Sequence, residues 1–183
     1  AYNSTLQGLE FYSGIPGSVG GAVKMNAGCY GSETSKVLKE ISVFNKKGIK
    51  KIISNRDLCF SYRNSNLSDQ DIVTSVIFKG EFGEKNLINS KINEIKVMRE
   101  TSQPIKNKTG GSTFKNPKGQ FAAKLIEQAD CKGLTFGDAT ISTKHSNFLI
   151  NLGKATSKDI ETLGKIVQDR VMQKMNIFLE WEI

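Results

Sequence analysis

The run from Gly14 to Gly31 is the first of four segments whose composition could support chemistry. Glycines occupy positions 14, 17, 20, 21, 28 and 31, and Pro16 lies among them. Because glycine has no Cβ, successive backbone N–H groups in such a loop can point at one anion and form a phosphate-binding nest. The run matches neither a Gly-x-Gly-x-x-Gly fingerprint nor a Walker loop. Its spacing alone leaves open both a cofactor-binding loop and a tight packing turn.

Three further segments each hold one polar side chain that could act on a ligand. Arg63 follows strand-forming residues, and a guanidinium there could bind a carboxylate or phosphate through two parallel hydrogen bonds. Ser112 follows a pair of glycines, and Glu182 lies one residue before the end. The chain has a single histidine, so proton donation by Ser112 is more natural than acyl transfer through a triad. The structural alternatives are a surface arginine, a serine turn and a solvated glutamate.

The net charge of +8 suits an acidic partner, which could be nucleic acid or a phosphorylated small molecule. Lysine pairs occur at positions 46–47 and 50–51, but no tract interleaves basic and aromatic residues as single-strand binders do. We therefore interpret the lysines as background composition and expect no nucleic-acid partner. A basic nucleic-acid binder stays an alternative, which a flat salt dependence of DNA association would exclude.

The three cysteines, Cys29, Cys59 and Cys131, are widely spaced and odd in number, which argues against a disulfide framework. We expect them to be small buried apolar groups, and we expect no metal site. No apolar stretch is long enough to cross a bilayer, and the first ten residues lack a signal pattern. These features predict a cytoplasmic chain.

Periodicity predicts the elements that position the first candidates. Residues 38–44 and 49–53 read as a hairpin around a glycine turn. Residues 71–78 carry apolar side chains at both sets of alternating positions, which predicts a strand covered on both faces. Helical spacing follows over 87–100, and the polar segment 101–108 predicts a domain boundary.

The remaining residues predict a second unit. A short helix is expected over 120–129, with Gly133 as its stop, and residues 148–150 form a short apolar strand. Thr156 can cap a final helix whose apolar residues recur at helical spacing as far as Met175. The tail over 178–183 alternates like a strand. The sequence therefore predicts an α+β protein with domains at residues 1–100 and 101–183.

These segments, in this order, resemble the UDP-N-acetylenolpyruvoylglucosamine reductases, a family of flavin-dependent enzymes of peptidoglycan synthesis. Residues 8–31 are similar to the second half of the family's flavin-binding domain. Several unrelated motifs in the correct order are more specific than any one of them. The chain lacks room after Pro117 for a tyrosine-bearing insertion and so resembles the shorter branch of the family. The later signatures lie at 60–63, 111–117, 123–127, 144–148 and 179–182.

The resemblance implies the second lobe of a two-lobed FAD-binding domain of the vanillyl-alcohol-oxidase type, followed by a small α+β substrate-binding domain. It also implies that NADPH reduces FAD, which then passes a hydride to the enolpyruvyl ether of a UDP-sugar, giving UDP-N-acetylmuramate for the cell wall and hence for cell shape and division. By position, Ser112 matches the proton donor. Arg63 and Glu182 match the residues that polarise the substrate carboxylate and stabilise the developing enolate.

The resemblance assigns two sets of binding residues. The positions similar to FAD contacts are Gly14, Ile15, Pro16, Gly17, Ser18, Gly20, Gly21, Ala22, Asn26, Gly28, Tyr30 and Gly31. The positions similar to substrate contacts are Lys115, Asn116 and His145.

The family's first lobe, with its own pyrophosphate loop, should precede Ala1, and the tail ends before a basic residue that commonly follows in the family. We therefore expect a fragment with little or no bound FAD and negligible reductase activity, because half of the flavin site is missing. The alternatives are another flavoprotein of the same fold and a non-catalytic nucleotide-sugar-binding module.

Overall fold

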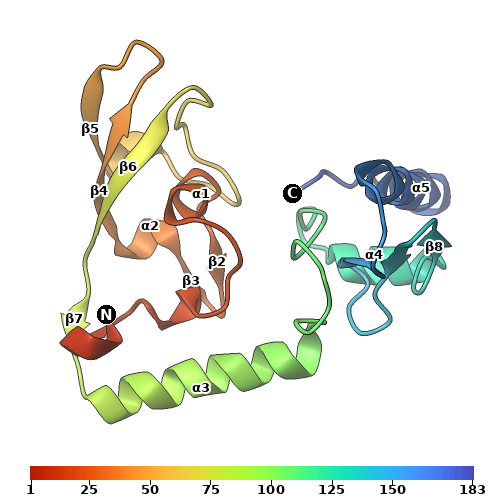
Figure 1. Ribbon diagram of the computed structural model, residues 1–183, viewed down its shortest axis with the longest axis horizontal. Coiled ribbons are helices and arrows are strands. Elements are labelled where there is room, and N and C mark those ends of the chain that lie inside the picture. Colours follow the sequence, from red (N-terminus) through yellow and green to blue (C-terminus); the bar gives the residue numbers. More distant parts are fainter. The chain divides into compact units, whose positions relative to one another are not determined.

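The computed structural model describes all residues, 1–183, as two compact units, which span Ala1–Val97 and Met98–Ile183 (Figure 1). Both units combine helices with small antiparallel sheets. The predicted α+β class is therefore confirmed. None of the helices combines the length and the apolar composition needed to cross a membrane.

A three-stranded antiparallel sheet, in the order β5-β4-β6, forms the framework of the first unit. It consists of β4 (Leu38–Phe44), β5 (Lys50–Ser54) and β6 (Ile72–Phe78). The predicted hairpin is confirmed, because β4 pairs with β5 in register from Glu40↔Ser54 to Phe44↔Lys50. One face of this sheet packs on a buried cluster that includes Val23, Leu58 and Leu67.

The strand β6 differs from the prediction, because only one of its faces is covered. Its pairing with β4 shifts register between Ser42 and Val43, so that Ser75 and Val73 oppose adjacent residues and Thr74 is the extra residue of a bulge. The bulge brings Val73 onto the same buried face as Val76. Side chains on the other face, Ile72 and Ile77 among them, are exposed.

Short elements surround this sheet. The region before β4 contains η1 (Tyr2–Ser4), β1 (Leu6–Gln7), η2 (Glu10–Tyr12), α1 (Val19–Lys24), β2 (Gly28–Cys29), β3 (Ser32–Glu33) and α2 (Thr34–Val37). The element η3 (Arg56–Leu58) follows β5, and β7 (Glu81–Phe82) follows β6 and pairs with β1. The cysteine prediction is wrong for Cys59, which lies exposed after η3 with φ 43°, whereas Cys131 is fully buried and Cys29 partly so.

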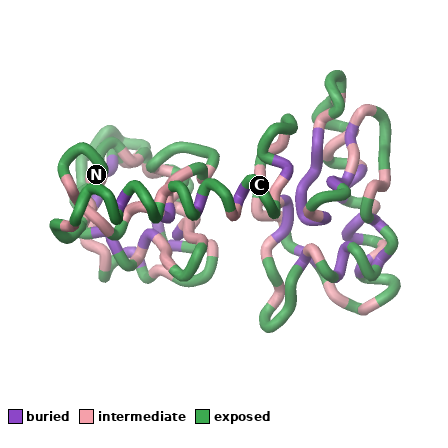
Figure 2. The backbone as a smooth tube through the Cα atoms, turned by 90° about the horizontal axis from the view of Figure 1, so that it is seen from below, coloured by how far each residue is buried: buried purple, intermediate pink, exposed green.

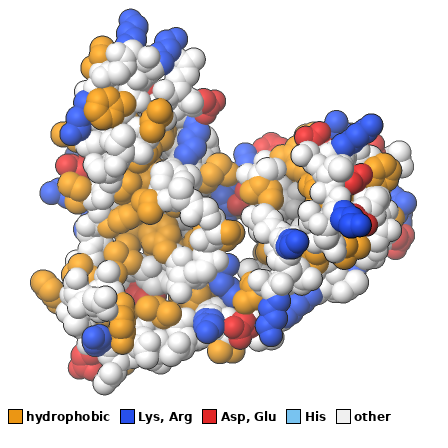
Figure 3. Space-filling model, in the orientation of Figure 1, with side chains coloured by type: hydrophobic (Ala, Val, Ile, Leu, Met, Phe, Trp, Pro, Cys, Tyr) orange, Lys and Arg blue, Asp and Glu red, His pale blue; other side chains and the backbone are white.

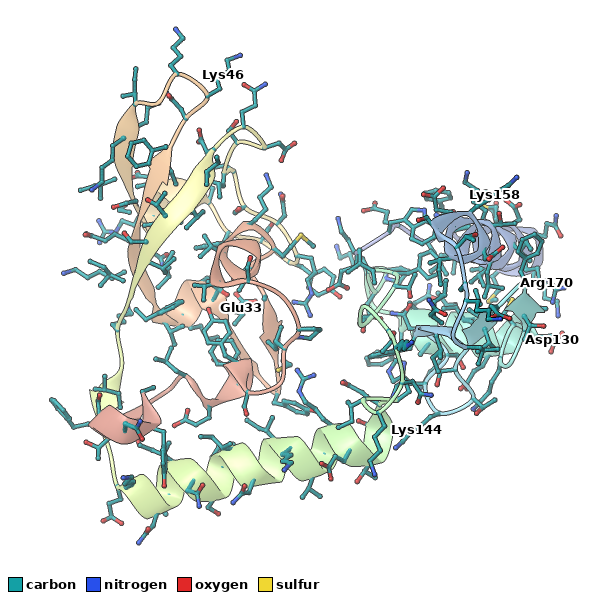
Figure 4. All side chains as sticks on the ribbon, viewed as in Figure 1. Glu33, Lys46, Asp130, Lys144, Lys158 and Arg170 are labelled. Carbon is teal, nitrogen blue, oxygen red and sulfur yellow. The ribbon has the colours of Figure 1, made fainter.

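The long helix α3 (Lys85–Ser102) confirms the helical periodicity. Its residues Ile88 and Ile95 are almost fully buried, while most of its other residues are exposed (Figure 2). The helix begins in the first unit and continues into the second. Within the second unit, Lys144 reaches back to its last turn, where Nζ donates a hydrogen bond to the carbonyl of Glu100 (Figure 4).

The second unit packs two helices on a small sheet. Its sheet has the order β10-β9-β8, with β8 (Thr135–Phe136), β9 (Ala139–Ile141) and β10 (Leu149–Asn151). The helices α4 (Ala122–Gln128) and α5 (Ser157–Met175) supply Leu125, Ile126, Leu163, Val167 and Val171 to one buried cluster.

The ends of these two helices show how far local signals determine them. The helix α5 begins with the expected capping box, in which Thr156 Oγ1 accepts from Asp159 N and Asp159 accepts from Thr156 N. Gly133 does not stop α4, because the helix ends at Gln128 and Asp130 already has the left-handed conformation, with φ 54°. The tail over 178–183 is not a strand, since only Trp181 forms a bridge, with Phe114.

Candidate functional site

The glycine-rich run of the first unit contains the short helix α1. Ser18 caps this helix, with its Oγ accepting from Gly21 N at 3.1 Å. At Gly17 the backbone has φ 121°, which side-chain-bearing residues rarely adopt, and a Cβ built there would meet nothing within 4 Å. Gly28 is required for a different reason, because a Cβ would lie 2.5 Å from the carbonyl of Ser32.

Buried polar residues hold the second half of this run in place. The Asn26 side chain is fully buried and bridges two segments, because Nδ2 donates to the Ser61 carbonyl at 3.0 Å and Oδ1 accepts from Ser35 N at 2.9 Å. Thr34 Oγ1 contacts the carbonyls of Ala22 and Ala27 at 3.1 and 3.0 Å. The Asn26 side chain therefore bonds to other parts of the protein through both of its polar atoms. Its expected contact with FAD stays a prediction, in which the backbone of Asn26 would meet the cofactor.

Arg63 and the glycine-rich run lie side by side although 35 positions separate Arg63 from Gly28. Arg63 has φ 51°, its guanidinium stacks on the ring of Tyr62 at 5.1 Å, and Nη2 donates to the Gly28 carbonyl at 2.9 Å. The Asn26 bond to the Ser61 carbonyl joins the same two segments. The structure therefore brings together the predicted arginine and the predicted cofactor-binding run.

Within the second unit, the segment that contains Ser112 pairs with one neighbouring segment on each of its two sides. The residue itself bridges to Phe148, and Phe114 bridges to Trp181. The backbone N–H of Glu182 donates to the Thr113 carbonyl at 2.8 Å. Ser112 and Glu182 are therefore held on neighbouring segments, 70 positions apart in the sequence, and both are half-buried.

The side chain of Asn147 fixes the same segment through paired hydrogen bonds. Its Oδ1 accepts from Phe114 N at 3.0 Å, and its Nδ2 donates to the Phe114 carbonyl at 2.7 Å. Its own carbonyl accepts from Thr113 N at 2.8 Å. Sequence reasoning gave Asn147 no role, although it lies in the motif over 144–148 that carried part of the resemblance.

The expected substrate residues already have protein partners. Lys115 Nζ lies 3.5 Å from Glu180 Oε2, in a partly exposed ion pair that a ligand could displace. Asn116 Oδ1 accepts from Ala122 N, the first residue of α4, at 2.9 Å. Both remain predictions as substrate contacts.

His145 presents a neutral imidazole. Its Nδ1 accepts a hydrogen bond from Asn147 N at 3.3 Å, and its ring meets the edge of Phe148 with centroids 4.7 Å apart. Burial lowers the pKa of His145 from its ordinary value of 6.5, and this outweighs the backbone hydrogen bond and the charge of Glu127, which raise it. Because Nδ1 accepts, the neutral ring carries its proton on Nε2 and can donate there.

Gly164 and Gln168 of α5, two residues that sequence reasoning missed, support the end of the chain. The ring of Trp181 packs against Phe114, with centroids 4.9 Å apart, and against Gly164 of α5, where a Cβ would lie 1.9 Å from Trp181 Cη2. Gln168 of α5 is buried and donates from Nε2 to the Leu179 carbonyl at 2.7 Å. The only sequence signal for Gly164 is a glycine inside a strong helical pattern, which indicates close packing.

The chain is thus a two-unit α+β protein, with a glycine-rich, side-chain-poor loop in one unit and a serine on the segment beside that of an acid in the other. Residues 103–183 match the family described as "UDP-N-acetylenolpyruvoylglucosamine reductase, C-terminal domain". Curated relatives and a solved structure match essentially the whole chain. We conclude that the chain belongs to the UDP-N-acetylenolpyruvoylglucosamine reductase family.

The relatives show how much of the family's length is present. The reductase of Nitrobacter winogradskyi is 48% identical over 180 residues, covering 98% of this chain and 59% of its own. The reductase of Caulobacter vibrioides is 48% identical over 185 residues, covering 100% of this chain and 62% of its own. The crystal structure of the enzyme from Thermus caldophilus has a TM-score of 0.88 and 41% identity, covering 100% of this chain and 65% of that one. The chain thus spans about three fifths of the length of the curated relatives that it matches.

Proposed function

We propose that this chain is the part of an FAD- and NADPH-dependent reductase that carries the proton donor and one cofactor-binding lobe. The substrate would be the enolpyruvyl ether of UDP-N-acetylglucosamine, and the product UDP-N-acetylmuramate for peptidoglycan. The observation that carries the proposal is the hydrogen bond from Glu182 N to the Thr113 carbonyl, which holds an acid beside the Ser112 segment. The relatives named as reductases support the same assignment.

The residues of the first unit fit a flavin dinucleotide. The run over 14–21 exposes its backbone at Gly14 and Gly17 with few side chains in the way, so a pyrophosphate could approach N–H groups closely. Val19 is 56% exposed and offers an apolar contact beside that backbone. When bound and reduced by NADPH, the flavin would supply the hydride that the substrate's β-carbon receives.

The residues of this chain would handle the charge and the proton. As the β-carbon gains a hydride, the electron pair of the double bond moves toward the α-carbon and its carboxylate. Arg63 would bind that carboxylate and stabilise the developing enolate together with Glu182. The Ser112 hydroxyl would then donate its proton to the α-carbon. A serine hydroxyl is a weak acid in water, so its effect depends on placement against that charge.

The decisive experiment replaces Ser112 with alanine in a full-length reductase that contains residues 1–183. The two half-reactions are followed separately through the flavin absorbance. We expect NADPH to reduce the flavin at the parent rate, and substrate reduction to fall by about 10²- to 10⁴-fold, the usual contribution of a general acid. Ser90→Ala, an exposed serine of α3, is the control and should leave both rates unchanged.

Two results would overturn the proposal. Unchanged substrate reduction by Ser112→Ala would remove Ser112 from the mechanism. A parent protein that binds the UDP-sugar and turns nothing over would instead be a non-catalytic nucleotide-sugar-binding module. Comparing NADPH with NADH in the same assay tests the cofactor preference, which rests on the family alone.

A further inference from the structure

The tip of the β4–β5 hairpin gathers four lysines with no acidic residue among them. Lys46 and Lys47 lie in the turn, and Lys50 and Lys51 begin β5. All four are exposed, and none belongs to an ion pair of the structure. Figure 4 shows Lys46 extending away from the ribbon at the end of the unit opposite α3.

The turn that carries these lysines is rigidly built. Asn45 Oδ1 accepts from Lys47 N at 2.9 Å and from Ile49 N at 3.0 Å, and Gly48, with φ 71°, donates from its N–H to the Asn45 carbonyl. Asn45 N in turn donates to the Ile49 carbonyl. The lysines and Ile49 are therefore presented by a preformed loop rather than by a flexible tail.

Exposed aliphatic side chains adjoin the lysines on the open face of the sheet. The register places Phe44 opposite Lys50 on one side and Ile72 on the other, with Ile52 two residues from Lys50 on the same face. Ile49, Ile52 and Ile72 are 54%, 67% and 68% exposed. Figure 3 shows hydrophobic and basic side chains together at this end of the unit.

We propose that this hairpin tip docks on an anionic phospholipid surface. Charge complementarity selects an acidic partner, because the tip holds four lysines that form no ion pair, against one acid, Asp71, next to Ile72 on the facing strand. The lysines are point charges without arginine forks, which suits a diffuse array of headgroups. The exposed apolar side chains beside the lysines are mostly aliphatic and suit hydrocarbon, with Phe44 as a single exposed ring, whereas single-strand binders stack successive bases on several aromatic rings.

The binding would be reversible and dependent on salt. A lysine near an anionic leaflet raises the membrane partition coefficient roughly fivefold, and the attraction falls off within a Debye length. The isoleucines would enter the boundary between headgroups and acyl chains and add a contribution that salt does not screen.

The test measures co-sedimentation of the chain with vesicles of phosphatidylcholine, with and without phosphatidylglycerol, over a salt series. We expect binding only with phosphatidylglycerol and a decrease as salt rises. The double variant Lys46→Gln, Lys47→Gln should lower the partition coefficient by roughly 25-fold, from two lysines at about fivefold each. The matched control, Lys154→Gln with Lys165→Gln, removes the same charge from exposed sites of the second unit and should change it little.

Three outcomes would overturn the proposal. An equal loss in both double variants would show that net charge alone drives binding. Failure of the parent chain to bind anionic vesicles would exclude the surface, and tighter binding to a DNA duplex than to vesicles would assign the tip to nucleic acid. Ile49→Ser separates the apolar contribution, since it should reduce the binding that remains at high salt and leave the salt dependence unchanged.

Discussion

Asn147 forms with Phe114 the same pair of hydrogen bonds that one β-strand forms with another, although only one of the two partners is backbone. The amide accepts from Phe114 N at 3.0 Å and donates to its carbonyl at 2.7 Å. Both residues are almost fully buried. A side chain therefore completes the pairing of the segment that starts at Ser112.

Replacing Asn147 with alanine should destabilise the protein strongly. The change leaves a donor and an acceptor of Phe114 buried without partners, at about 1–3 kcal/mol each, so we expect a loss of roughly 2–6 kcal/mol. Urea denaturation measures it as a lower midpoint. Asn151→Ala is the control, because Asn151 bonds the turn residues Gly153 and Ala155 in a partly buried site and should cost less. An equal or larger loss in the control would refute this account of Asn147.

Replacing Gly164 with alanine should displace the ring of Trp181. The new Cβ would lie 1.9 Å from Cη2, and Phe114 packs on the same ring, so relief requires movement of the tail that holds Glu182. Overpacking of about 1–3 kcal/mol should exceed the gain in helix propensity, which is at most about 1 kcal/mol. The chain has one tryptophan, so its fluorescence spectrum reports the movement directly. Lys165→Ala, on the exposed side of α5, should leave both the spectrum and the midpoint unchanged.

His145 should make the protein less stable in mild acid. Burial lowers its pKa in the folded state from the ordinary 6.5, so the unfolded chain binds a proton that the folded chain resists. The stability contribution of the neutral ring is therefore complete above about pH 6.5 and is lost progressively as the pH falls below that value. His145 is the only histidine, and the free energy of unfolding of His145→Gln should fall less between pH 7 and pH 5. Parallel curves for the two proteins would show that His145 does not cause the dependence.

Two substitutions of Asn26 distinguish the stability contribution of its side-chain hydrogen bonds from the cost of its strained backbone conformation. Asn26→Ala and Asn26→Gly both remove the bonds to Ser61 and Ser35, which we expect to cost roughly 2–4 kcal/mol. The backbone φ of 43° is strained for alanine and free for glycine, so the alanine variant should be less stable by about a further 1 kcal/mol. Thermal unfolding of the three proteins compares them. Equal stability of the two variants would contradict the backbone contribution.

Local patterns were sufficient for the long elements. The helix α5 and its capping box follow from Thr156, Asp159 and apolar residues at helical spacing, because capping and amphipathic burial act within one segment. The β4–β5 hairpin follows in the same way from two strand patterns around Gly48. The family resemblance likewise depends only on the order of motifs along the chain.

Contacts between distant segments were decided by the tertiary structure. The bulge at Thr74 reverses which residues of β6 are buried, and no pattern within the strand reports the register of its neighbour. The exposure of Cys59 depends on its position after η3, not on its type.

The same distinction between sequence and tertiary structure applies to the candidate site. The sequence by itself predicted Ser112, Arg63 and Glu182 as the residues that act, because the order of motifs along the chain carries the family resemblance and side-chain chemistry is a property of each residue. Only the tertiary structure placed Glu182 beside the Ser112 segment and Arg63 on Gly28, since hydrogen bonds over 69 and 35 positions form only after the chain has folded.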